Sequence, residues 1–469
     1  MTRYTMSLIL DKWIAPHLDT SKWEFFDLSC KNRDATNDKV LLDSVIAGTR
    51  LCAIFKEPTI TPSAAQVKEF GLSKPYPSPN GAMRKGWNGI TISRDTIHIE
   101  GIKLGYDKQV LFDRHAVGGE YGAQYKAVGA GRLVTTFFPD DGSSPILAGD
   151  RTLTDNENVV VTYHNPLDNV KDLAHHFFAR CLEKKFVPYV VTKKTVFKWQ
   201  ESFWLIMKNV FDEHYKQQYI DAGVLPDGKL SHLISDSATM QIVKWRKGGF
   251  GMAAHNYDGD MLTDEISTVH RSPGFITSSL LGKRKDGTLI RENEASHGTV
   301  SDLWAMHNRG EETSMNPLGL TEALLATLNH AAEIEGKNLK SIRLFTDTLR
   351  KALHNTFRYG QGTKDMAGEK GLSTEKFIEK VAWRLGRYLA KMEEDESILP
   401  EMLVPSLKFR RNYNVDRGAL EEMFNEYDTD KSGTINIDEF ETLMVKLGVA
   451  PLKDPNKKSS ASSDKNKDE

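Results

Sequence analysis

The sequence predicts an α/β fold over roughly its first 400 residues, followed by a small acidic helical unit. From about residue 10 to residue 400, short apolar runs typical of strands alternate with segments of helical periodicity. The turn-forming sequences SPNG, PDDG, GKRKDG and NPLG punctuate these runs. Beyond residue 415 the chain becomes acidic, and apolar residues recur at helical spacing over residues 416–447.

One strand–helix–strand unit can be placed from the sequence alone. Residues 158–165 are typical of a strand, residues 169–185 of a helix and residues 186–192 of a second strand. We expect the helix to bury one face, formed by Val170, Leu173, Ala174, Phe177 and Phe178. The second strand delivers Lys193 and Lys194 to its carboxyl end, where open α/β sheets usually place ligand-binding groups.

The composition excludes several classes of function. The 469 residues include 62 lysines and arginines against 64 aspartates and glutamates, so no overall charge favours nucleic acid or an anionic membrane as a partner. No apolar run reaches the ~18 residues of a membrane span. Cys30, Cys52 and Cys181 form no CxxC pair, so we expect reduced core thiols rather than a disulfide framework or a zinc site.

Residue types suited to an acidic substrate gather in three stretches. Residues 78–97 and 113–121 supply arginines, whose planar guanidinium groups pair well with carboxylates. In residues 255–265, Asp260 and Asp264 stand four positions apart. On a helix, both carboxylates would point to one face and could share Mg²⁺ or Mn²⁺. If the arginines converge on one site, that site would bind a polyanion.

Seven motifs follow the order and approximate spacing of the signature segments of the homodimeric isocitrate dehydrogenases. They are TITPSAAQVKEF, SPNGAMR, DRHAVGGEY, VTKKT, NYDGDMLTDE, EASHGTV and ETSMNPLG. The resemblance covers residues 10–405 and is to the eukaryotic NADP-type lineage, apart from one loop. It implies an isocitrate/isopropylmalate dehydrogenase-like fold and a homodimer with shared active sites.

The resemblance also implies a division into domains. A large cofactor-binding domain would comprise residues 1–86 and 271–403. A small domain with the catalytic and metal-binding residues would comprise residues 87–118 and 167–270. Residues 119–166 would form a dimer clasp between two copies of the chain.

Carried over position by position, the resemblance assigns roles to individual residues. The three carboxylates of isocitrate would be held by Thr61, Ser78, Asn80, Arg84, Arg94 and Arg114. Tyr121 and Lys193 would be the acid/base pair. The catalytic Mg²⁺ or Mn²⁺ would bind Asp260 and Asp264 of one subunit and Asp236 of the other. The cofactor would contact Lys56, Thr59, Thr61, Glu294, His297, Gly298, Thr299, Val300, Asp302, Leu303 and Asn316.

The chain departs from the family just after its His-Gly-Thr-Val motif. NADP-using members carry Arg-His where this sequence has Asp302 and Leu303. A 2′-phosphate beside Asp302 would be repelled, whereas a ribose diol could donate hydrogen bonds to the carboxylate. Gln66, where relatives often carry arginine, removes another positive charge. We therefore expect NAD rather than NADP.

Residues 428–439, DTDKSGTINIDE, match the EF-hand calcium loop at every informative position. The expected Ca²⁺ ligands are Asp428, Asp430, Ser432, Thr434 and Glu439. We assign residues 404–450 to an EF-hand domain and expect residues 451–469 to be a disordered tail. No second intact loop is present, so the pairing partner would come from a degenerate unit within 400–420 or from the other subunit.

These features predict an enzyme that oxidatively decarboxylates isocitrate to 2-oxoglutarate and CO₂ with NAD, assisted by metal and modulated by calcium. Two alternatives stay open. One is a dehydrogenase of another 2-hydroxy acid, such as isopropylmalate or tartrate, and the other is a catalytically silent calcium-sensing scaffold. The presence of both Tyr121 and Lys193 argues against the scaffold. We expect the mitochondrial matrix as the compartment, with the cytoplasm as the alternative.

Overall fold

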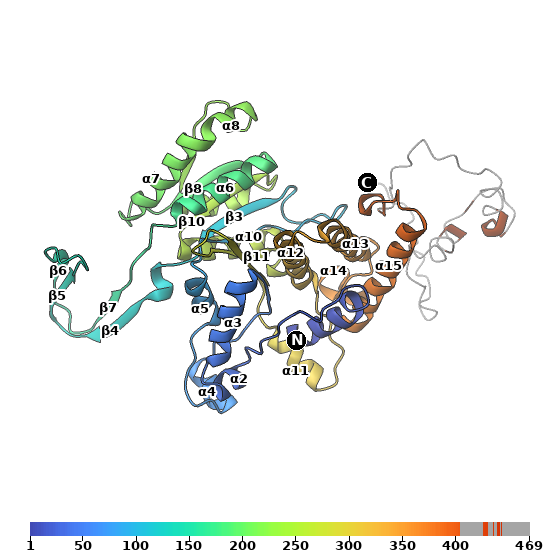
Figure 1. Cartoon of the computed structure of the whole chain (residues 1–469), viewed down its shortest axis with the longest axis horizontal. Coiled ribbons are helices and arrows are strands. Elements are labelled where there is room, and N and C mark those ends of the chain that lie inside the picture. The colour runs from blue at the N-terminus through green and yellow to red at the C-terminus, as the bar shows by residue number, and fades with distance from the viewer. Residues whose placement is uncertain (404–424, 430–434, 436–438, 441, 443–469) are drawn as a thin grey trace, which may run out of the picture.

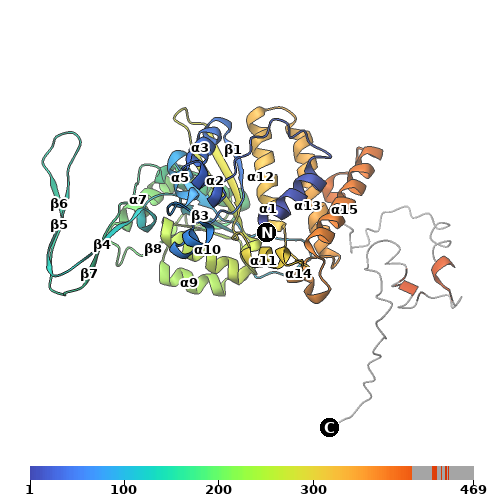
Figure 2. The ribbon, with the colours of Figure 1, turned by 90° about the horizontal axis from the view of Figure 1, so that it is seen from below.

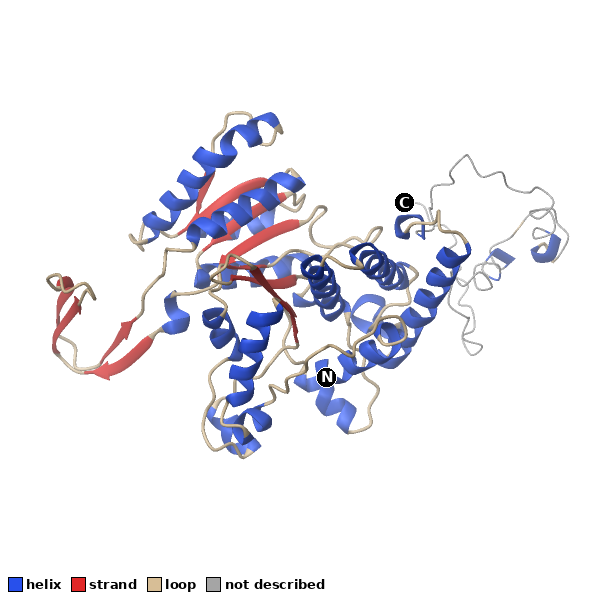
Figure 3. Cartoon of the chain, viewed as in Figure 1, coloured by secondary structure: helices blue, strands red, loops and turns tan. Residues whose placement is uncertain are grey.

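The α/β class is confirmed in the computed structural model, which describes residues 1–403, 425–429, 435, 439–440 and 442. An eight-stranded sheet runs through the body, with helices packed on it (Figures 1 and 3). In spatial order its strands are β1 (Ala53–Lys56), β12 (Leu289–Ala295), β11 (Thr277–Lys283), β2 (Thr91–Ser93), β3 (Val110–His115), β10 (Phe250–Ala254), β8 (Val187–Thr192) and β9 (Ser231–Ile234).

The strand directions place several predicted site residues at one edge of the sheet. β3, β10, β8 and β9 pair in parallel, so their carboxyl ends meet at the same edge. Arg114 lies near the end of β3, Lys193 directly follows β8, and Asp236 lies two residues beyond β9. β2, between β11 and β3, is antiparallel to both neighbours, so Arg94, just after its last residue, lies beside Phe112 in β3 and not at this edge.

The helices divide into groups along the chain. They are α1 (Thr2–Ile9), α2 (Cys30–Ala35), α3 (Lys39–Leu51), α4 (Ala64–Phe70), α5 (Pro79–Gly86), α6 (Val170–Lys184), α7 (Gln200–Val210), α8 (Lys216–Asp221), α9 (Ser235–Lys244), α10 (Asn256–His270), α11 (Ser301–Asn308), α12 (Leu318–Glu335), α13 (Leu339–Arg358), α14 (Lys364–Ala367) and α15 (Thr374–Glu394). The helices α1, α12, α13 and α15 share one apolar core, whereas α6 and α7 share another.

The predicted strand–helix–strand unit is confirmed as β7 (Asn158–Thr162), α6 and β8. All five residues of the predicted buried face of α6 are fully buried. Leu173, Phe177 and Phe178 lie in the core that also holds residues of α7 and β10. This packing fixes α6 against the sheet, directly behind the strands that carry the arginines.

Residues 124–162 form two antiparallel ribbons that project from the body (Figures 1 and 2). β4 (Gln124–Val128) pairs with β7, and β5 (Gly131–Phe137) pairs with β6 (Ile146–Leu153). They lie within the segment expected to be a dimer clasp. Many of their large apolar side chains are exposed, among them Tyr125, Phe137, Leu147 and Val159.

Two of the four expected turns are helix starts instead. SPNG provides the N-cap residue and first residues of α5, and NPLG leads into α12. Proline is favoured both in turns and at the first helical position, so the sequence signal is shared. The other two turns are confirmed: GKRKDG joins β11 to β12, and PDDG lies between β5 and β6.

The three cysteines are buried and free, as expected for core thiols. Over the described part of the chain, no helix combines the length and apolarity needed to cross a membrane. Asp430, Ser432, Thr434, most of the expected EF-hand domain and the expected tail 451–469 lie outside the described residues.

Candidate active site

Arginines from separate elements converge on Asp260, which the sequence alone could not show. Arg114 pairs with Asp260, and Arg94 Nη1 lies 3.4 Å from Asp260 Oδ1 and 3.6 Å from Asp264 Oδ1. Burial lowers the pKa of Arg84 on α5, an effect that Glu294 opposes and Arg94 reinforces. Burial and the neighbouring Arg84 lower the pKa of Arg114 to about 10. Three guanidinium groups held this close create a local positive field suited to a polyanion.

Asp260 and Asp264 project from one face of α10, as their spacing predicted. Burial would raise the pKa of Asp260, but Arg114 and Arg94 outweigh it and lower that pKa. The Asp264 side chain is 68% exposed, against 32% for Asp260. Both Asp260 oxygens have protein partners, Arg114 and Tyr121, whereas Asp264 is largely exposed. Two hard carboxylate donors on one helix face are the ligand type that a divalent cation such as Mg²⁺ takes.

Gly259 allows α10 to approach β3 closely enough for these contacts. A Cβ at this position would lie 2.8 Å from both Cβ and Cγ of Arg114. Asn256, one turn earlier on α10, accepts a hydrogen bond of 2.9 Å from Arg114 Nε. The helix therefore holds the guanidinium from two sides, through Asn256 and Asp260.

Tyr121 joins this group from the short helical turn Gly119–Gly122. Its hydroxyl donates a hydrogen bond of 2.6 Å to Asp260 Oδ2, and its ring centroid lies 4.9 Å from Arg114 Cζ. Burial raises the pKa of Tyr121 to about 12, although Arg114 opposes the shift. The hydroxyl therefore keeps its proton at neutral pH and is available as a donor.

Lys193 and Asp236, two other expected site residues, pair with each other. Among the residues the structure describes, no hydrogen bond or ion pair joins either of them to Asp260 or Asp264. Over the same residues, no three or more His, Cys, Asp or Glu side chains gather as a potential metal site. In one chain the expected site residues thus fall into two groups that no hydrogen bond or ion pair joins within the described residues.

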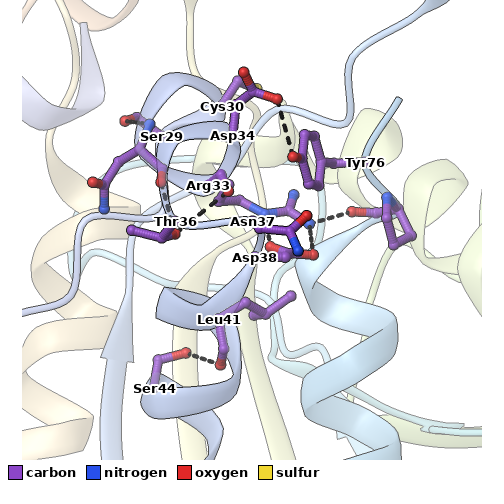
Figure 4. A network of polar contacts seen from close by, with 12 residues as sticks. Ser29, Cys30, Arg33, Asp34, Thr36, Asn37, Asp38, Leu41, Ser44 and Tyr76 are labelled. Atoms are coloured by element: carbon purple, nitrogen blue, oxygen red, sulfur yellow. Dashed lines mark hydrogen bonds and ion pairs between the residues drawn. The ribbon is translucent and has the colours of Figure 1, made fainter. Parts of the chain in front are cut away.

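Ser78 and Asn80 belong to the start of α5, and the residue before them accepts a hydrogen bond from Arg33, whose polar contacts Figure 4 shows. The Arg33 side chain is fully buried and donates two hydrogen bonds to the Asp38 carboxylate, of 2.7 and 2.9 Å. A third, of 3.0 Å, goes from Arg33 Nη2 to the carbonyl oxygen of Pro77. Arg33 therefore anchors the residue just before Ser78. Thr59 and Thr61 lie on the segment between β1 and α4.

The strand β12 carries one site residue that sequence reasoning missed, Glu292. It is buried two positions before Glu294, which accepts a 2.5 Å hydrogen bond from Lys56. Burial and the charge of Glu294 raise the pKa of Glu292 to about 8. The only signal was the repeated acid in RENE, which alternation on a strand places on one face.

Polar atoms without protein partners surround the expected cofactor segment. Asn80 Oδ1, Glu292 Oε1 and His297 Nε2 are buried, and none has a hydrogen-bond partner within the described residues. Such atoms are costly to bury unless a ligand or water completes them. A bound polar ligand or ordered water would complete these three atoms.

The segment after His297 and Gly298 differs from the expected loop. Thr299 is followed by Val300 in a left-handed conformation, with φ of +54°, which then begins the helix α11. A β-branched residue at positive φ is strained and marks functional sites more often than other positions. Asp302 is exposed in the first turn of α11, where the helix dipole favours an acid.

The other residues expected to affect cofactor binding, Leu303, Asn316 and Gln66, make contacts within the protein. Leu303 packs partly buried against the core shared by α1 and α12. Asn316 donates a 2.8 Å hydrogen bond to Asp365. Gln66 closes a capping box with Ser63 at the start of α4, which gives its amide a local structural partner.

The first and last residues of the expected calcium loop come together. Asp428 and Glu439 are both buried, each with 6% exposure. The backbone N and Oγ1 of Thr429 donate hydrogen bonds of 2.7 and 2.8 Å to Glu439 Oε1. Position 12 of the loop is therefore folded back beside position 1, as a calcium loop requires.

Comparison with known proteins agrees with this geometry. A family model for isocitrate/isopropylmalate dehydrogenase matches residues 21–381, and an EF hand domain model matches residues 419–447. A relative from Phaeodactylum tricornutum, mitochondrial isocitrate dehydrogenase [NAD(+)] 1, is 60% identical over 96% of this chain and 84% of its own length. Mitochondrial isocitrate dehydrogenase (NAD(+)) from Ostreococcus tauri is also 60% identical, over 82% and 83%.

A crystal structure of isocitrate dehydrogenase from Ostreococcus tauri, in complex with isocitrate and magnesium(II), superposes with a TM-score of 0.79. It is 60% identical and covers 82% of this chain and 96% of that one. The fold and the EF-hand predicted from the sequence are confirmed. The chain belongs to the isocitrate/isopropylmalate dehydrogenase family and carries an EF-hand domain after the family's body.

Proposed function

We propose that the protein is an NAD-dependent isocitrate dehydrogenase that converts isocitrate to 2-oxoglutarate and CO₂. The observation that carries the proposal is the convergence of Arg84, Arg94 and Arg114 around Asp260. Three guanidinium groups match the three carboxylates of isocitrate better than the two of isopropylmalate or tartrate. The relatives at 60% identity carry the same activity in their names.

The residues divide the chemistry among them. Thr61, Ser78 and Asn80 would hold the substrate together with the arginines. Tyr121 would donate a proton to the enol carbon after CO₂ leaves, since its raised pKa keeps the hydroxyl protonated. Lys193 would accept the proton of the C2 hydroxyl.

Metal and cofactor sites follow from the same arrangement. Asp260 and Asp264, with Asp236 from a second copy of the chain, would hold Mg²⁺ or Mn²⁺. When bound, the metal supplies Lewis acidity to the hydroxyl and carboxylate oxygens of the substrate. NAD, which accepts the hydride, would lie against Lys56, Thr59, Glu294 and the segment from His297 to Leu303, with Asn316 beyond it. The exposed carboxylate of Asp302 would accept hydrogen bonds from the adenosine ribose and repel a 2′-phosphate.

A homodimer with shared sites would bring the two separated groups together. Lys193 and Asp236 of one copy would face Tyr121, Asp260 and Asp264 of the other. The clasp ribbons over residues 119–166 expose apolar side chains that isolated two-stranded ribbons cannot keep stable alone. Pairing of these ribbons between two copies would bury those side chains and hold the dimer.

Intersubunit complementation tests this arrangement. Lys193→Met and Asp260→Asn should each be inactive as homodimers, because each lacks one half of every site. A mixed dimer would contain one site with both native residues, so co-refolded or co-expressed variants should regain up to about a quarter of wild-type activity. Failure of the mixture to exceed the separate variants would contradict shared sites.

The activity itself is tested by a rate assay with isocitrate, comparing NAD with NADP and measured with and without Mg²⁺. We expect turnover with NAD and Mg²⁺, and far less with NADP. An inactive protein that still binds calcium would support the scaffold alternative. Activity with isopropylmalate or tartrate but not with isocitrate would support the other dehydrogenase.

Calcium modulation through residues 404–450 is the further part of the proposal. Asp428, Asp430, Ser432, Thr434 and Glu439 would bind Ca²⁺, and occupancy would bias the enzyme by its coupling to the body, typically ~1–3 kcal/mol. Glu439→Gln removes the bidentate ligand without touching the catalytic residues. If this variant keeps the whole calcium response of the wild type, the regulatory role fails.

We also propose the mitochondrial matrix as the compartment, because the two relatives at 60% identity are named mitochondrial. Fractionation of the source cells with an antibody against the chain would test the location. Recovery in the cytosolic fraction would contradict it.

The proposed domains keep the bounds given above: residues 1–86 with 271–403, and residues 87–118 with 167–270.

A further inference from the structure

A buried polar network lies behind two of the converging arginines. Arg180 on α6 donates a hydrogen bond of 2.8 Å from Nη1 to Asp113 Oδ2, and its Nη2 pairs with Asp95. Asp113 is fully buried and also accepts a 2.5 Å hydrogen bond from Ser93 Oγ. His176, one turn before Arg180, has Nε2 3.2 Å from Ser93 Oγ and 3.8 Å from Asp113 Oδ1.

The network is built on the residues next to the site arginines. Asp95 follows Arg94 in the chain, and Asp113 precedes Arg114. Successive side chains of a strand point to opposite faces, so Asp113 faces α6 while Arg114 faces α10. β2 and β3 are paired with Ser93 opposite Asp113, and Arg94 N donates to the Phe112 carbonyl at 2.8 Å. The Arg180 guanidinium therefore ties β3, through Asp113, to the segment just after β2, through Asp95.

The charges in the network depend on Arg180. Burial would raise the pKa of Asp113, but the charge of Arg180 and the hydrogen bond from Ser93 outweigh it and lower that pKa. Burial raises the pKa of Asp95, and Arg180 opposes this shift. Burial lowers the pKa of His176 to about 4, and the charge of Arg180 adds to this shift, so the imidazole is neutral at pH 7 and Arg180 carries the charge that the two acids face. Without Arg180, two inward-facing carboxyl groups would lose their counter-charge.

We propose that Arg180 is a positioning residue that fixes the separation and direction of Arg94 and Arg114, and through them the affinity for the polycarboxylate substrate. The proposal rests on the proposed function, in which those two arginines bind substrate carboxylates. Arginine suits the role because its planar fork binds two acids at once, Asp113 on β3 and Asp95 in the segment that follows β2. A lysine ammonium is a single point charge and lacks that fixed fork.

The variants Arg180→Met and Arg180→Lys test the role by steady-state kinetics. For Arg180→Met we expect the KM for isocitrate to rise about tenfold or more, the KM for NAD to stay within about twofold, and kcat to fall less than the KM rises. Arg180→Lys keeps the charge without the fork, so its KM for isocitrate should be intermediate. A merely structural role would not separate the two KM values.

Arg350→Met is the matched control. Arg350 on α13 also bridges two acids, Glu322 and Asp347, but makes these contacts away from the site arginines. The Arg350→Met substitution should lower the unfolding midpoint and leave the KM for isocitrate unchanged. If Arg180→Met is too unstable to assay, the KM of Arg180→Lys decides the question.

The positioning role is overturned if the wild type is active and the KM for isocitrate is unchanged in Arg180→Lys. The same holds for Arg180→Met wherever that variant can be assayed. An equal rise of both KM values would overturn it as well. A wild type that does not oxidise isocitrate would instead refute the proposed function. In that case calorimetry, which needs no turnover, still compares the affinity for isocitrate of Arg180→Met with that of the wild type.

Discussion

Gly259→Ala tests whether the close approach of α10 to β3 sets the geometry of the site. The added Cβ would lie 2.8 Å from Cβ and Cγ of Arg114 and 3.3 Å from its Cα. Carbon atoms in ordinary contact lie ~3.5–4.0 Å apart, so α10 must move away from the strand by ~0.7 Å or more. Rotation of the Arg114 side chain alone cannot relieve the contact with the backbone Cα. The carboxylate of Asp260, one residue along, would move with the helix.

Two opposing effects set the size of the change. Alanine in a helix interior is favoured over glycine by ~0.5–1 kcal/mol, whereas overpacking a tight site costs ~1–3 kcal/mol. We therefore expect a net destabilisation of about 1 kcal/mol. A displacement near 1 Å at a catalytic group can cost ~100-fold in rate, so a shift of ~0.7 Å should lower kcat/KM for isocitrate by about tenfold.

Gly386→Ala provides the control, because Gly386 is exposed within α15 and a Cβ there would meet no atom within 4 Å. Urea unfolding should show a raised midpoint for this variant and a lowered one for Gly259→Ala. The kinetic assay should show normal kcat/KM only for the control. If Gly259→Ala is stabilised as much as the control and keeps its kcat/KM, the close approach does not set the site.

Three further changes can be predicted. Asp302→Arg combined with Leu303→His should narrow the preference for NAD over NADP, since each charge-assisted contact to a 2′-phosphate is worth ~1.5–3 kcal/mol; an unchanged ratio of kcat/KM values would place the discrimination elsewhere. Val300→Gly should raise the KM for NAD by loosening the cofactor segment, while relief of ~1 kcal/mol of left-handed strain offsets part of the packing that the Val300 side chain loses, so an unchanged KM for NAD would contradict the reasoning. Burial would raise the pKa of Glu322, but the charges and hydrogen bonds of Arg350 and His354 together outweigh burial and lower that pKa to about 2, below the ordinary value of 4.5. Stability from this group is thus present above pH 4.5 and lost as the pH falls through about 2. Glu322→Gln should lower the free energy of unfolding at neutral pH by on the order of 3 kcal/mol and weaken its dependence on pH in the acid range. A pH profile of stability parallel to that of the wild type would refute this expectation.

Features that depend on local spacing were predictable, whereas those that depend on distant partners were not. The buried face of α6 followed from helical periodicity, and the shared face of Asp260 and Asp264 followed from a separation of one turn. Arg180 gave no such signal, because its two partners, Asp95 and Asp113, lie far away in the sequence. Glu292 was missed for the same reason: its burial depends on how β12 is covered by other elements.

The site also explains how a nearly neutral chain builds a strong anion-binding surface. The formal net charge is only −2, so the positive field must come from arrangement rather than excess. Across β2 and β3 the charges alternate: Arg180 lies behind, Asp95 and Asp113 come next, Arg94 and Arg114 follow, and the acids of α10 lie in front. The charge of Asp260 opposes the effect of burial on the pKa of Arg114, which lets this guanidinium stay ionised although it is almost fully buried. A polycarboxylate entering from the front would compete with the α10 acids for the arginines, while the layer behind stays fixed. Affinity for the substrate then depends on the strength of the pairs it must replace, and changes to Asp260 alter substrate binding as well as metal binding.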